Sequence, residues 1–279
     1  MGWLTDPFSL QFMQRALAAG LIVATIGGIV GSYVVNRGLA FLGDALAHGI
    51  LPGIAIAFLA GFDLLVGAAI GAVVMIAGIA FVNRRTFLPP DVAIGLLFVG
   101  MLALGVAIVS ASAAFTTDLF GFLFGDILGI STRDLILTGA TLALTVAVTA
   151  VMWRPFFVLC LDEEKAEVLG LRAGLAHRVM LLLVALSIVT SFEAVGTLLV
   201  FGMLLAPAAS AALLVHRLLP AMALAIVVGW ISVVAGLLIS YHLDVAGSAS
   251  IVAVAVIIFF AAVLVRPLVH ARHTPRGEL

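Results

Sequence analysis

The chain has 279 residues, of which 65% are hydrophobic and only 10% are charged, whereas a soluble domain carries about 25% charged residues and at most about half apolar ones. No soluble fold of this length can bury so much apolar surface, and a formal net charge of −1 excludes an electrostatic nucleic-acid binder. The single cysteine, Cys160, excludes disulfides within the chain and thiolate metal clusters. These properties predict an integral membrane protein.

Long apolar runs between short polar breaks predict an all-α, polytopic bundle of transmembrane helices. A bilayer core about 30 Å thick requires roughly 20 apolar residues per helix, and the run 251–265 is apolar on every side, unlike the alternating strands of a transmembrane barrel. About nine spans are expected, near residues 16–36, 39–60, 63–83, 91–110, 132–153, 177–193, 196–215, 219–240 and 247–265. Eight spans remain open, because residues 177–215, around Ser191-Phe192-Glu193, also fit one long helix and a re-entrant piece. Residues 1–279 are expected to form a single integral membrane domain.

Basic residues in the short loops predict the orientation, because Lys and Arg accumulate on the cytoplasmic side of membrane proteins. In a nine-span topology one side collects Arg84 and Arg85, the basic residues from Arg154 to Arg178, Arg217, and those from Arg266 onward. We therefore expect the C-terminus in the cytoplasm and the N-terminus outside, with Arg15 as the one dissenting charge. An eight-span topology would move one terminus.

The segment 111–131 faces outward in this topology. It combines several phenylalanines with Asp118, Asp126 and glycines, which is typical of a short interfacial helix and turn. Packing over the helix ends is favoured over direct contact with a cargo.

Two ionisable residues, Asp44 and His48, lie inside the second apolar run rather than at its ends. Ionisable side chains are costly inside a membrane and usually line a pathway. Their spacing of four residues places both side chains on one helix face about one turn apart, so a carboxylate and an imidazole can hold one ion together. The alternative is a buried Asp–His hydrogen bond that fixes helix packing.

The Asp44–His48 pair is a half-site, because first-row divalent ions take about four to six ligands. A two-fold dimer in which these helices face the axis would present two Asp and two His. Nitrogen and oxygen ligands of this kind suit zinc or manganese and disfavour copper(I), which prefers sulfur.

Three further residues are candidates for the ion path. Pro52 and Gly53 follow His48 within about one turn, where proline removes a backbone donor and loosens the helix, although a simple kink has the same signature. Glu193 is expected near the outer surface as a gate for a cation, and a solvated loop carboxylate is an equally good interpretation.

The longest cytoplasmic connection is expected to contain a short charged helix at about residues 162–170. Asp162 can cap its first turn, Glu163 suits a helix N-terminus, and Gly170 can end the helix. Such a helix is either a docking piece for a cytoplasmic partner or an ordinary amphipathic interfacial loop. The sequence contains no Gly-x-x-x-x-Gly-Lys-Ser/Thr loop, so any ATP used in the process must be bound by another chain.

Three stretches together carry a family resemblance: Gly43 to Ala55, Asp162 to Gly170, and Val195 to Ala209. They resemble the permease family of zinc, manganese and iron ABC importers. Glu163, Ala166 and Gly170 have the spacing of the importer coupling motif, and the third stretch is similar to the family's late Gly-to-Pro helix. The outward segment Asp118 to Leu128 also looks familial, although Asp126 stands where the family has a small residue. The likeness spans nearly the whole chain.

The resemblance implies a permease homodimer in a bacterial plasma membrane, bound to two cytoplasmic ATPase subunits and supplied by an extracytoplasmic metal-binding protein. It also implies that Asp44 and His48 line the translocation path, that the 162–170 helix transmits the movement of the ATPase, and that the ion passes by alternating access. ATP is expected only on the partner subunit. No catalytic residue and no permanently bound cofactor are expected in this chain, and zinc is the preferred cargo, ahead of manganese or iron.

The main alternative is a proton-coupled secondary transporter of a small cation, in which Asp44, His48 and Glu193 form a proton relay. Such a transporter needs no ATPase, so deletion of the 162–170 helix would spare its activity and abolish that of an ABC importer. A membrane-embedded enzyme would need more convergent ligands than the sequence offers, and a channel would conduct without an ATPase. A siderophore or cobalamin permease has no need of an Asp–His ligand pair.

Overall fold

The computed structural model describes residues 6–87, 89–111, 127–161, 168 and 170–271. Within this part, nine helical stretches are long and apolar enough to cross a membrane. They are α2 (Gln11–Asn36), α3 (Ala40–Gly49) together with α4 (Leu51–Ala60), α5 (Leu64–Arg85), α6 (Pro90–Ser110), α8 (Thr132–Val151), α11 (Ala173–Val195), α12 (Thr197–Leu214), α13 (Leu218–Leu243) and α14 (Gly247–Ala271). The short elements η1 (Pro7–Ser9), η2 (Ile127–Gly129) and α9 (Trp153–Leu161) complete the described part, which contains no strand. The predicted all-α bundle is confirmed.

Two breaks in the helices differ from those predicted. The second span is divided, because α3 ends at Gly49 and α4 begins at Leu51. The sixth and seventh spans separate at Gly196 and not at Ser191-Phe192-Glu193, which is part of α11. Gly196 has a φ of +81°, a conformation that glycine adopts without steric cost. A backbone turn of this kind interrupts a helix more effectively than polar side chains within an apolar run.

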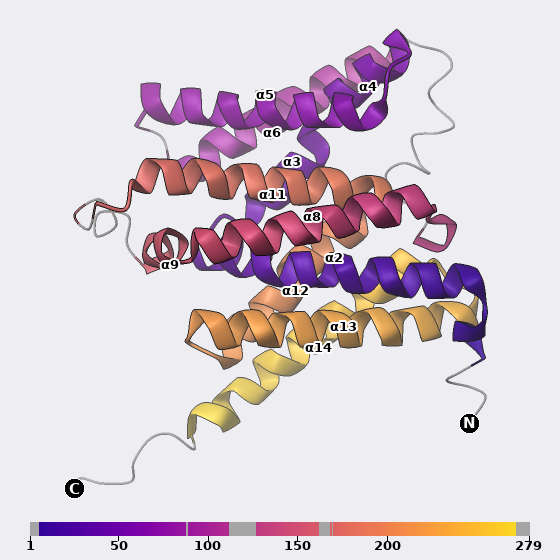
Figure 1. The fold of residues 1–279 in the computed structure, drawn as a ribbon. Coiled ribbons are helices and arrows are strands. Elements are labelled where there is room, and N and C mark those ends of the chain that lie inside the picture. Colours follow the sequence, from indigo (N-terminus) through magenta and orange to yellow (C-terminus); the bar gives the residue numbers. More distant parts are fainter. Residues whose placement is uncertain (1–5, 88, 112–126, 162–167, 169, 272–279) are drawn as a thin grey trace, which may run out of the picture.

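The helices α5, α11, α8, α2 and α13 lie with their axes roughly parallel, and α14 runs obliquely to them (Figure 1). α5 and α6 form one edge of the bundle, α11, α8 and α2 follow in that order, and α13 and α14 form the other edge. Behind the middle of this row, α3 contacts α6, α11 and α12, and α12 contacts α2, α13 and α14. The helix with the candidate ligands therefore has neighbours on several sides.

Glycines bring α2 against the backbone of α12. A Cβ at Gly27 would lie 2.6 Å from the carbonyl oxygen of Met203, and a Cβ at Gly31 would collide with the carbonyl oxygen of Leu204. The two glycines of the Gly27-x-x-x-Gly31 motif thus allow α2 and α12 to pack closely. Small residues have the same role between helices of other membrane proteins.

A second set of glycines joins α4 to α5. A Cβ at Gly53 would collide with the carbonyl oxygen of Gly67, and a Cβ at Gly71 would lie 3.0 Å from the carbonyl oxygen of Ile50. The Gly67-x-x-x-Gly71 spacing therefore faces the turn at which α3 passes into α4.

One end of the bundle, which we call the basic end, carries arginines from five places in the chain: Arg37, Arg84, Arg154, Arg172 and Arg217. Nη1 of Arg37 donates a hydrogen bond of 2.9 Å to the carbonyl oxygen of Leu159, which brings the end of α2 to the end of α9. Arg84 of α5 and His177 of α11 line one cavity, so these helices meet at the same end.

The opposite end of the bundle holds an ion pair between the starts of α5 and α8. Nη2 of Arg133 donates to Oδ2 of Asp63 at 3.1 Å, and Asp63 also caps α5 by accepting from the backbone N–H of Leu65 at 2.8 Å. The hydrogen bond from Arg133 is the main reason that the pKa of the Asp63 carboxyl lies below its usual value, and the bond from Leu65 lowers it further.

The outward segment 111–131 and the short helix 162–170 lie largely outside the described residues. After that first gap the chain resumes with η2, and Ser131 then caps α8 in a capping box with Asp134. In the second segment only Val168 and Gly170 are described, and Gly170 has a φ of +68°, the conformation of a glycine that ends a helix.

Candidate functional site

Asp44 and His48 are the polar residues of an otherwise apolar helix. The three residues between them on α3, from Ala45 to Ala47, are buried. The side chains of Asp44 and His48 remain 32% and 31% exposed. The pair is therefore accessible from outside the packed core, whereas a hydrogen bond that only fixed helix packing would be expected to lie within it.

The two side chains touch across one helical turn. Nδ1 of His48 lies 3.4 Å from Oδ1 of Asp44 and 3.1 Å from the backbone carbonyl oxygen of Asp44. In the tautomer that carries its proton on Nδ1, this N–H donates to these oxygens, and Nε2 keeps its lone pair for a metal ion. A carboxylate that orients an imidazole in this way also raises its basicity toward a metal ion. The pair thus offers one nitrogen and one carboxylate group to a cation.

An aromatic wall stands beside His48. The ring of Phe98, on α6, lies 5.9 Å from the imidazole centroid at an interplanar angle of 90°, and Phe41 packs edge-on against Phe98 at 5.7 Å. These rings restrict the orientation of the imidazole and replace water on one side of it. No sequence pattern singles out Phe98, because its contact depends on how α6 crosses α3.

A chain interruption follows the pair directly. Ile50 separates α3 from α4, and Pro52 is the second residue of α4. Proline has no N–H to donate to the carbonyl oxygen of His48, four residues earlier, so the helical bond at that oxygen is missing. Gly53 permits the tight contact with α5 at the same level.

The remaining candidate residues are dispersed. Glu193 lies in the last turn of α11, three residues before the break at Gly196. Asp162, Glu163 and Ala166 lie outside the described residues, so the structure does not place them. As far as the described residues go, no group of three or more His, Cys, Asp or Glu side chains could hold a metal ion.

Comparison with known proteins decides the family. Residues 9–266 match the family model of the ABC 3 transport family. The chain belongs to this family.

Its relatives include membrane proteins of metal-transport systems. The manganese transport system membrane protein MntC of Listeria innocua is 36% identical over 92% of this chain and 91% of that protein. The chelated iron transport system membrane protein YfeD of Yersinia pestis is 32% identical over 98% of this chain and 92% of that protein. Among solved structures, PsaBC from Streptococcus pneumoniae in complex with Fab is 30% identical, covers 96% of each chain and has a TM-score of 0.84.

Membership of the ABC 3 family decides what the helices alone leave open. The chain is the membrane-spanning permease of a metal ABC importer and is not itself an enzyme. This assignment decides against the proton-coupled secondary transporter. The preference for zinc is not confirmed, since the relatives described above are named for manganese and chelated iron.

The structure of this ABC 3 permease also reveals a residue that the sequence analysis missed. Arg37, at the turn between α2 and α3, donates to the carbonyl oxygen of Leu159 at 2.9 Å, and its Nη2 lies 3.3 Å from Nδ1 of His177. Arg37, which lies three residues before the start of α3, therefore joins the ends of α2 and α9 to the start of α11. An arginine in a short loop was an available signal, but its partners lie 122 and 140 residues further along the chain.

Proposed function

We propose that this permease imports a divalent first-row metal ion, with manganese as the first candidate and iron or zinc as the alternatives. The observation that carries the proposal is the Asp44–His48 pair: a carboxylate and an imidazole 3.4 Å apart, about one-third exposed, on a helix that is otherwise apolar. Oxygen and nitrogen ligands accept all three ions, and manganese is favoured because it suits carboxylate ligands and because a relative is named for it.

One chain supplies too few ligands for such an ion, which takes about four to six. In our proposal, two copies of the permease form a homodimer, and the Asp44–His48 pairs of the two α3 helices face the same path. Each pair contributes Nε2 and a carboxylate oxygen, which together give four protein ligands. Pro52 and Gly53 loosen the helix next to this site, and Glu193 gates the path from the end opposite the basic end.

The energy for transport is proposed to come from two ATPase subunits at the basic end, which we assign to the cytoplasm of a bacterium because Lys and Arg accumulate there. The C-terminal end of α14 would then lie inside and the start of α2 outside. The segment 162–170, with Asp162, Glu163, Ala166 and Gly170, receives the movement of the ATPase dimer. An extracytoplasmic metal-binding protein delivers the ion to the opposite end, and the two gates open in alternation.

Uptake of radioactive manganese into vesicles that contain the permease and its ATPase, with the metal-binding protein and ATP supplied, tests the site. Asp44→Ala and His48→Ala should each lower uptake at least about tenfold, because even residues that only support a metal ligand cost this much. The matched control is the pair Asp244→Asn and His242→Ala, which changes the same residue types at the end of α13, where asparagine tolerates the positive φ of residue 244. The controls should transport like wild type.

Three outcomes separate the parts of the proposal. Wild-type uptake in both the Asp44 and the His48 variant would overturn the site. Uptake that persists without the ATPase would favour a secondary transporter. Competition with unlabelled manganese, iron and zinc ranks the cargo, and stronger competition by zinc than by manganese would reverse the order proposed.

A further inference from the structure

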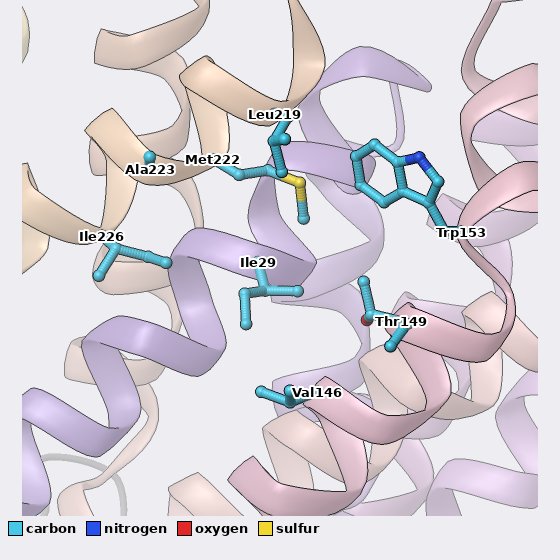
Figure 2. A pocket seen from close by; sticks show the side chains of 9 residues that line it. Ile29, Val146, Thr149, Trp153, Leu219, Met222, Ala223 and Ile226 are labelled. Atoms are coloured by element: carbon cyan, nitrogen blue, oxygen red, sulfur yellow. The ribbon is translucent and has the colours of Figure 1, made fainter.

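An apolar groove lies between α2, α8 and α13, close to the basic end. It has a volume of about 460 Å³ and is open to one side (Figure 2). Figure 2 shows Ile29 of α2, Val146 and Thr149 of α8, and Met222 and Ile226 of α13 around it, with the indole of Trp153 at one end. Nearly every lining atom is carbon, so the groove matches a hydrocarbon occupant.

The groove contains one polar group without a partner. Thr149 is only 8% exposed, and within the described residues its hydroxyl has no hydrogen-bond partner. Of the other buried threonines of α8, Thr138 and Thr141 donate to carbonyl oxygens one turn earlier, whereas the hydroxyl of Thr145, which does not line the groove, also has no partner within the described residues. A buried hydroxyl without a partner is costly. Thr149 is therefore placed to donate a hydrogen bond to a ligand in the groove.

Two arginines lie near the end of the groove where Trp153 is located. Arg154 follows Trp153 in the chain, and Arg217 precedes the lining residue Leu219 by two positions. Both arginines are exposed, and neither guanidinium group makes a hydrogen bond or an ion pair with another described residue. Tryptophan is enriched where hydrocarbon meets headgroups, and arginine suits phosphate.

We propose that this groove binds an anionic phospholipid of the surrounding bilayer, with an acyl chain along α2 and α13, an ester carbonyl on the Thr149 hydroxyl, and the phosphate at Arg154 and Arg217. The dimensions fit one leaflet. The lining residues Leu219 and Ile226 are seven residues apart on α13, which corresponds to about 10 Å along this helix, whereas half of the hydrocarbon core is about 15 Å. The acyl chain thus fills the groove without leaving its leaflet.

The charges favour an anionic lipid over a zwitterionic one. The cytoplasmic leaflet of a membrane is negative, and basic residues near the surface are attracted to its anionic headgroups. A phosphate at the groove is close to both guanidinium groups, while the added positive charge of a choline headgroup opposes them. Because α8 continues through Met152 into α9, a bound lipid also supports the corner between these helices.

The experiment uses the purified complex of permease and ATPase, with retained lipid counted by native mass spectrometry after addition of phosphatidylglycerol or phosphatidylcholine. Wild type should retain phosphatidylglycerol at least about tenfold more tightly than phosphatidylcholine. Arg154→Ala and Arg217→Ala should each lower the affinity for phosphatidylglycerol about fivefold, and about 25-fold in combination. Thr149→Val should weaken both lipids equally, by about fivefold, because both carry the same ester groups.

Two control variants complete the design. Arg85→Ala removes an exposed arginine at the same end of the bundle but away from the groove, and it should leave retention unchanged. Ala223→Trp fills the groove and should abolish retention of both lipids at this site. Equal retention of the two lipids by wild type, or an Arg85→Ala loss as large as that of the arginine pair, would overturn the proposal. So would a disulfide between two copies of an Ala223→Cys variant, which would show that a second permease covers the groove.

Discussion

Replacement of Gly27 by alanine tests the backbone contact between α2 and α12. The added Cβ would lie 2.6 Å from the carbonyl oxygen of Met203 and 3.0 Å from its carbonyl carbon, whereas ordinary contacts begin near 3.4 Å. The obstacle is the backbone of a helix and cannot rotate away like a side chain. The two helices must therefore separate by several tenths of an ångström.

A matched control isolates the cost of this separation. Gly139, on α8, is also inside a helix, but a Cβ there would meet no atom within 4 Å. Alanine gains about 1 kcal/mol over glycine in helix propensity at both positions, and overpacking costs about 1–3 kcal/mol at Gly27 alone. The propensity gain cancels in the comparison, so Gly27→Ala should be less stable than Gly139→Ala by about 1–3 kcal/mol.

Thermal unfolding of the purified permease, followed by tryptophan fluorescence, measures the difference. Gly139→Ala should unfold above the wild-type midpoint, and Gly27→Ala should unfold at or below it. Equal midpoints for the two variants would refute the close contact, because both would then have gained only helix propensity.

Two further predictions concern a helix cap and the cysteine. Ser131→Ala removes the capping box in which Ser131 and Asp134 exchange hydrogen bonds of 3.2 and 3.0 Å, and should cost about 1 kcal/mol; an unchanged thermal midpoint would contradict the cap. Cys160 lies in α9, which follows the fifth membrane span. Burial raises the pKa of its thiol to about 11, although the charge of Arg37 opposes this shift. Because the thiolate is the reactive form, iodoacetamide should modify folded permease slowly at neutral pH and faster as the pH rises toward that pKa, and equal rates for folded and unfolded chains would contradict the burial.

The spans were predictable because the membrane imposes a length and a composition that can be read along the chain. All nine helical stretches overlap the predicted ranges, and the errors lie where backbone geometry decides. At Gly196 a positive φ ends the helix, whereas the polar side chains of Ser191 and Glu193 do not interrupt it. The candidate ligands were visible for the same reason as the spans, since Asp44 and His48 stand out against an apolar run.

Contacts between segments that are distant along the chain could not be predicted from the sequence. The approach of Phe98 to His48 and the hydrogen bond from Arg37 to Leu159 depend on helix crossings, not on local periodicity. The lipid groove has the same origin, because α2, α8 and α13 each contribute ordinary apolar residues. Only their arrangement places the Thr149 hydroxyl, which has no hydrogen-bond partner within the described residues, in the lining of the groove.

The kinds of contact around α3 bear on how an ion could pass. Glycines press α2 against the backbone of α12 and α4 against the backbone of α5, so each pair holds a fixed spacing. The glycines of α3 itself face side chains. A Cβ at Gly43 would meet the side chains of Leu204 and Phe201, and a Cβ at Gly49 would meet the side chain of Met75. Side-chain ends can rearrange within staggered rotamers, whereas a helix backbone cannot yield without breaking its hydrogen bonds. At its two glycines, the helix of the Asp44–His48 pair is thus held by side-chain contacts, which can adjust more easily than the backbone contacts that fix the two neighbouring helix pairs.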